Sequence, residues 1–228
     1  MNEAATPTAT AGGRVSTART VGVIAIAYAA SIIVQNALFA GAPNYGDPLD
    51  IVLTYHAQHQ STLAVTSGLE AVNMVLLLLF VTALHGLVQR RGGIGADWSR
   101  LAVAAGSTLA ALSALTIATH IAVILAAKGQ TAPTPAFELV WHLHAATFAL
   151  SLPALGATFI GGTLATHASG LTRPWQRLFG LAGGSLPILA GLGNLAIADG
   201  SPLLFVGVLG LALWLVWLMV TGLRLVRG

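Results

Sequence analysis

The sequence predicts an all-α, polytopic membrane protein with six transmembrane helices and both termini in the cytoplasm. Of its 228 residues, 56% are hydrophobic and only 7% are charged, whereas a typical soluble domain carries about 25% charged residues. A membrane-spanning helix needs about 20 predominantly apolar residues. Six apolar segments reach that length, at roughly 20–41, 61–88, 101–127, 136–166, 178–198 and 203–225.

These segments occupy nearly the whole chain, which leaves no room for a soluble module. We therefore expect a single six-helix transmembrane domain over residues 19–228, preceded by a disordered polar tail over residues 1–18. The apolar run after Arg19 is longer than the apolar core of a signal peptide, so we expect the first segment to remain as a helix. The chain has no cysteine, so any metal must be held by histidine, carboxylate or carbonyl groups.

The basic residues indicate how the chain is oriented. With the N-terminus inside, Lys128 is the only basic residue that falls outside, which is the bias expected of loops in a cytoplasmic membrane. The Ala-, Gly- and Val-rich composition is typical of bacteria of high GC content, so we expect a multi-pass protein of the bacterial inner membrane. The basic residues lie in loops, so we expect the bilayer as the surroundings, a membrane protein or a second copy as a partner, and no nucleic acid.

The loop after the first segment is the longest and contains an apolar stretch, 48–59. Its apolar residues have mixed spacing, and two interpretations stay open: a short interfacial helix, or the start of the second span. His56 and His59 lie three residues apart in this stretch, and we expect both to be solvated near the membrane surface.

Helical periodicity places polar side chains along one face of each of the first four segments. The last two segments lack such a stripe and are rich in glycine and leucine. We expect a polar-lined bundle of the first four helices with the last two packed against it, and close helix crossings at Gly156, Gly180 and Gly184. The polar stripes contain Tyr28, Ser31 and Gln35; Thr62, Thr66, Glu70 and Asn73; Ser113, Thr116 and His120; and His144, Thr147, Ser151 and Thr158.

Glu70 lies inside the second apolar segment. An ionisable group in lipid costs from about 3 kcal/mol to several times that unless it faces a bundle interior, a wet cavity or a partner, so it indicates a functional site. Asn73 shares its helical face, and Gln35 and Asn36 lie at a comparable depth of the first segment. We expect these four residues to bind a ligand in the outer leaflet.

His120 and His144 lie near the ends of two other apolar segments. With Glu70 they could bind a divalent transition metal, relay protons or orient a polar ligand. Two facing imidazoles could also bind a b-type haem axially. The remaining interpretation is that these histidines are structural groups with ordinary hydrogen bonds.

The segment FELVWHLHAATF places Glu138 and His142 one helical turn apart, on a shared face. That spacing suits two ligands of a single zinc, copper or iron ion. Glutamate, histidine and tryptophan are also common as anchors at the level of the lipid headgroups, so both interpretations stay open.

Two stretches carry a resemblance: ARTVGVIAIAYAASIIV at the first segment, and TRPWQRLFGLAGGSLPILAGLGNL, a basic and aromatic loop that opens a Gly-rich span. Together they resemble an uncharacterised bacterial family of six-helix membrane proteins, a domain of unknown function. The resemblance implies the fold and no activity, and the many histidines of this chain depart from it.

The leading functional hypothesis is an outward-opening histidine and glutamate site that binds a metal ion or a small ligand, for transport or for redox support of a partner. The alternatives are a non-catalytic structural or accessory subunit of a membrane complex, and a b-type haem protein. No nucleophile elbow, phosphate-binding loop or HExxH motif occurs in the chain, so the sequence favours a protein that is not an enzyme.

Overall fold

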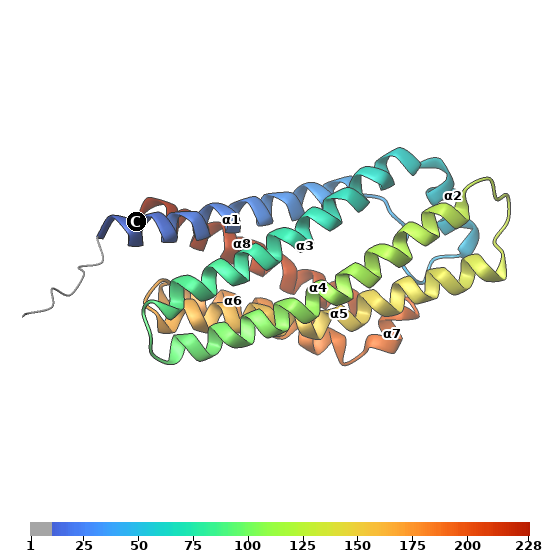
Figure 1. Ribbon diagram of the computed structural model, residues 1–228. Helices are drawn as coiled ribbons and strands as arrows, with labels where there is room; N and C mark the ends of the chain where they lie inside the picture. Colours follow the sequence, from blue (N-terminus) through green and yellow to red (C-terminus); the bar gives the residue numbers. More distant parts are fainter. Residues whose placement is uncertain (1–10) are drawn as a thin grey trace, which may run out of the picture.

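The computed structural model describes residues 11–228, and in that part of the chain it contains helices and turns but no strand. Figure 1 shows an elongated bundle with the C-terminus beside the start of the first helix. The helices are α1 (Ala11–Leu38), α2 (Leu49–Gln58), α3 (Gln60–Gln89), α4 (Ile94–Ala127), α5 (Pro135–Ala168), α6 (Pro174–Gly191), α7 (Asn194–Ala198) and α8 (Leu204–Arg227).

Five of the described helices, α1, α3, α4, α5 and α8, are long and apolar enough to cross a membrane. This supports a multi-pass membrane protein. The predicted span at 178–198 differs in the structure, because α6 ends at Gly191 after 18 residues and the chain turns before α7 begins at Asn194. The sixth long helix expected from the sequence is therefore two shorter ones.

The first loop contains a separate helix, α2, so the structure selects the short-helix interpretation over an early start of the second span. α2 follows Pro48 and ends at Gln58, and His59 alone separates it from α3. The first helix, α1, begins at Ala11, which is earlier than the sequence predicts. Residues 11–18 are thus helical rather than part of the predicted tail, and residues 1–10 lie outside the described residues.

The six longest helices form a closed ring in the order α1, α3, α4, α5, α6, α8, with α8 packed against α1. The turns α3–α4 and α5–α6 lie at the end of the bundle where α1 starts and α8 finishes, while α2 lies at the opposite end (Figure 1). We call these the arginine end and the α2 end.

Glycines allow the last helices to approach their neighbours closely. A Cβ on Gly22 would lie 2.6 Å from the carbonyl oxygen of Gly222, and a Cβ on Gly222 would lie 2.9 Å from that of Gly22. Gly156 and Gly184 oppose each other in the same reciprocal way where α5 crosses α6. The crossing expected at Gly156 and Gly184 is confirmed.

Aromatic rings fill the half of the bundle nearer the arginine end. Trp214 of α8 stacks on Phe159 with 4.1 Å between ring centroids and on Trp217 with 4.2 Å. All three side chains, together with Phe80, are almost completely buried. The buried histidines, His56, His120 and His144, lie in the other half, nearer α2.

Candidate functional site

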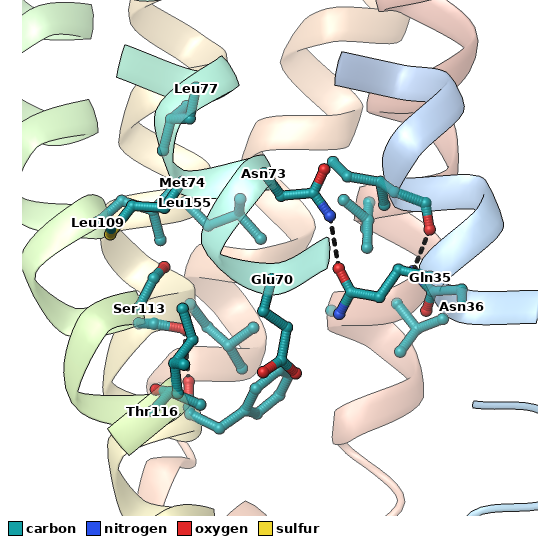
Figure 2. A pocket seen from close by; sticks show the side chains of 18 of the residues that line it. Gln35, Asn36, Glu70, Asn73, Met74, Leu77, Leu109, Ser113, Thr116 and Leu155 are labelled. Carbon is teal, nitrogen blue, oxygen red and sulfur yellow. Dashed lines mark hydrogen bonds between the residues drawn. The ribbon is translucent and has the colours of Figure 1, made fainter. Parts of the chain in front are cut away.

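A cavity of about 240 Å³ lies inside the bundle, toward the α2 end (Figure 2). Its deeper wall is apolar and includes Leu77, Leu109 and Leu155, whereas Glu70 and Gln35 lie nearer the α2 end. The cavity is lined from α1, α3, α4 and α5, the four helices with polar stripes, and also from α8. The contribution of α8 was not expected from the sequence.

An amide pair forms one wall of the cavity. Asn73 Nδ2 donates a hydrogen bond of 2.5 Å to Gln35 Oε1, which joins α3 to α1 (Figure 2). Asn73 is only 8% exposed, and its Oδ1 is buried with no hydrogen-bond partner among the described residues. Asn36 is exposed and donates to the carbonyl of Ile32 at 2.9 Å. The structure thus brings the predicted amides to one cavity.

Glu70 reaches from α3 into the space between α4 and α1 (Figure 2). Its side chain is 15% exposed, and its Oε2 lies 3.3 Å from Nδ1 of His120, which is 3% exposed. A carboxylate can only accept, so His120 Nδ1 is the donor when Glu70 is ionised. The expected neighbours Glu70 and His120 are therefore in direct contact.

Three imidazoles lie next to one another at this end of the cavity. The ring of His120 stacks on that of His144 with 5.1 Å between centroids, and it meets the ring of His56 edge-on at 6.0 Å. His56 Nδ1 lies 2.8 Å from the carbonyl of Val52, and His144 Nδ1 lies 3.2 Å from that of Thr116. A carbonyl only accepts, so both Nδ1 atoms carry the proton and leave Nε2 as the acceptor.

His56 is the site residue that sequence reasoning missed. It is 3% exposed, so the expectation that it is solvated is wrong, while His59 is exposed as expected. The reason is that α2 packs its buried residues Val52, Leu53 and His56 onto α4 and α5. The helical spacing of Val52 and His56, four residues apart, is the sequence signal that could have found it.

The loop between α1 and α2 contributes Tyr45, whose ring contacts Trp141 at 5.2 Å and His144 at 5.8 Å between centroids. Burial, and then the negative charge of Glu70, raise the pKa of Tyr45, so its phenol stays protonated. Burial, together with the nearby His120 and against the hydrogen bond to the Val52 carbonyl, lowers the pKa of His56 to about 4. Tyr45 and His56 are therefore both uncharged at neutral pH.

We compared this arrangement with the predicted cofactors. The described residues contain no group of three or more histidine, aspartate and glutamate side chains that could hold a metal ion, so the divalent metal stays a prediction. Axial haem ligation requires ring nitrogens that point at the iron from opposite sides. His120 and His144 instead meet face to face, with 21° between their planes, so this pair does not fit a haem between them.

Glu138 and His142 take no part in the cavity. Both side chains are exposed on α5. Trp141, which lies between them in the sequence, and His144, which follows them, are buried in the bundle. The structure therefore separates His142 from His144, and Glu138 from Glu70. Their role as metal ligands stays a prediction.

No known protein family, no curated protein and no solved structure matches this sequence. The resemblance to a bacterial family of unknown function therefore stays a prediction. Any functional conclusion has to come from the geometry of the cavity.

Proposed function

We propose that the chain is a six-span protein of the bacterial inner membrane, in which α6 and α7 together make the remaining crossing and both termini face the cytoplasm. At about 1.5 Å per residue, the 18 residues of α6 are about 27 Å long, and α7 follows after a short turn. The arginines of the α3–α4 and α5–α6 turns and of the end of α8 lie at one end, which supports this orientation.

We further propose that the cavity binds a small amphipathic cation. The observation that carries this proposal is Glu70, a carboxylate that lines an intramembrane cavity and has His120 as its only ion-pair partner among the described residues. A charge in such surroundings needs a partner of opposite sign. A cationic head beside Glu70 supplies that charge, and an apolar tail would lie against the leucines of the deeper wall.

The volume of the cavity limits the ligand. For size, an apolar cavity of about 150 Å³ holds benzene, so the larger cavity here suits a ring with a substituted amine.

We propose transport of the cation as the role of this binding, with Glu70 as the anionic ligand.

We expect Glu70→Gln to weaken binding of a fixed cation at least tenfold. The probe is benzyltrimethylammonium, and its neutral carbon isostere, neopentylbenzene, serves as the matched ligand. Isothermal titration calorimetry of the full chain in detergent gives the affinity. Wild type should prefer the cation, and Glu70→Gln should lose that preference while it keeps its affinity for the isostere.

The matched control is Glu138→Gln, which removes one negative charge from an exposed position of α5. It should keep the cation affinity within twofold of wild type. Equal affinity of wild type for the cation and the isostere would contradict the proposal, as would a Glu70→Gln variant that binds the cation as tightly as wild type.

A further inference from the structure

The arginine end of the bundle carries a large excess of positive charge. Asp97 is the only acidic side chain that the described part of the chain places there, and it is already 2.9 Å from Nη1 of Arg100. The remaining arginines therefore lack an acidic partner of this chain within the described residues. The arginines at this end with described side chains are Arg19, Arg90, Arg91, Arg100, Arg173, Arg177, Arg224 and Arg227.

Two of these arginines line a pocket of about 540 Å³, together with Thr17, Leu87 and Ser169. Arg90 Nη1 donates to Thr17 Oγ1 at 3.1 Å, toward α1. Arg91 Nη1 donates to the carbonyl of Ser169 at 2.9 Å, toward the end of α5. These bonds hold the consecutive guanidinium groups on two sides of one pocket.

The pocket offers hydrogen-bond donors that the described residues do not use. Neither Arg90 nor Arg91 has a carboxylate within ion-pair distance in the described part of the chain, and each guanidinium has five N–H groups. Planar guanidinium groups match the oxygens of phosphate in paired hydrogen bonds.

We propose that this pocket, which we call the Arg90–Arg91 pocket, binds a phosphate group. The phosphate belongs to an anionic phospholipid headgroup or to a soluble phosphate ester. Headgroup phosphates lie at the ends of membrane-spanning helices, and basic pockets between such helices on the cytoplasmic side bind anionic headgroups. The proposal is independent of the cation site, because Glu70 lies in the other half of the bundle.

The test measures binding of short-chain lipids to the full chain in a neutral detergent. Dihexanoylphosphatidylglycerol, dihexanoylphosphatidylcholine and inorganic phosphate are titrated separately by calorimetry. Wild type should bind the anionic lipid at least tenfold more tightly than the zwitterionic one. The double variant Arg90→Gln/Arg91→Gln should lose at least tenfold of that affinity, while Glu70→Gln should keep it.

The matched control is Arg177→Gln/Arg224→Gln, which removes the same charge from exposed positions at the same end. It should stay within twofold of wild type, and thermal midpoints without lipid show that each variant is folded. Inorganic phosphate that competes with the anionic lipid supports a soluble phosphate ester, and lipid binding that phosphate does not disturb supports a headgroup. Equal losses in the two double variants would overturn the proposal, as would a wild type that does not distinguish the two lipids.

Discussion

Acidification from pH 7 to pH 4 is expected to lower the free energy of unfolding by about 3 kcal/mol through His56 alone. The folded protein holds the pKa of this side chain at about 4, below its ordinary value of 6.5. Between these values the unfolded chain binds a proton that the folded chain does not. The contribution of His56 is therefore present above about pH 6.5, falls as the pH falls toward 4, and changes no further below that.

Thermal unfolding of the detergent-solubilised protein across this pH range measures the effect. His56→Leu cannot titrate, so its stability should depend on pH less steeply than that of wild type. The control is His59→Leu, one turn of α2 away and exposed, which should keep the dependence of wild type. Parallel pH curves for wild type and His56→Leu would show that His56 is not buried against His120 and Trp141 as described.

Gly156→Ala is expected to destabilise the protein by about 2 kcal/mol, within the range measured for overpacked interiors. The added Cβ would overlap the carbonyl oxygen of Gly184, which belongs to the backbone of α6 and cannot rotate away. The two helices would have to separate, and their packing would be lost along the crossing. The thermal midpoint in detergent measures this loss.

A glycine-to-alanine substitution at Gly86 should raise the free energy of unfolding instead of lowering it. Gly86 lies inside α3, and a Cβ there meets no atom within 4 Å, so Gly86→Ala should stabilise the helix by about 0.5–1 kcal/mol. If Gly156→Ala proved neutral or stabilising, α5 and α6 would not cross as closely as the structure shows.

Helical periodicity was sufficient to predict the polar residues that line the cavity. Glu70 and Asn73 are three residues apart on α3, and Ser113 and Thr116 are three apart on α4, so each pair shares a helical face in any α-helix. A polar face inside an apolar segment must avoid lipid, and in a bundle the interior is the place that allows this. This constraint alone predicted that these residues and Gln35 face the same interior space.

The contribution of α8 could not be predicted in the same way. Its cavity residues include Gly207, Val208 and Leu211, and such residues face lipid as readily as they face a cavity. Hydrophobic periodicity gives no inward direction in a helix that is apolar on all sides. The break between α6 and α7 was missed for a related reason, since glycine and leucine continue through it without a change of hydropathy.

The position of His56 depended on tertiary structure. α2 is a short helix of ten residues, and sequence alone does not say whether such a helix lies on the membrane surface or folds onto the bundle. The structure places it over the α2 end of the cavity, where Trp141 contacts His56 at 5.7 Å between ring centroids. One buried face on a short helix thus adds a third imidazole to the site.

We propose that water reaches the cavity beside Glu70 and that the cavity favours cations. Cysteine labelling measures both properties. The chain has no cysteine of its own, so Ser113→Cys places a single thiol in the cavity wall. Thiols react as thiolates, which need water. The measurement compares the rates of a cationic and an anionic methanethiosulfonate reagent, each divided by its rate with free mercaptoethanol. Ser107→Cys, exposed on the same helix, serves as the control for a lipid-facing thiol.

We expect the thiol at position 113 to react with both reagents faster than the thiol at position 107, and to favour the cationic reagent at least tenfold. Addition of Glu70→Gln should remove that preference and leave the thiol accessible. A thiol at position 113 as unreactive as the one at position 107, or a preference for the cationic reagent that persists without the Glu70 carboxylate, would contradict the account.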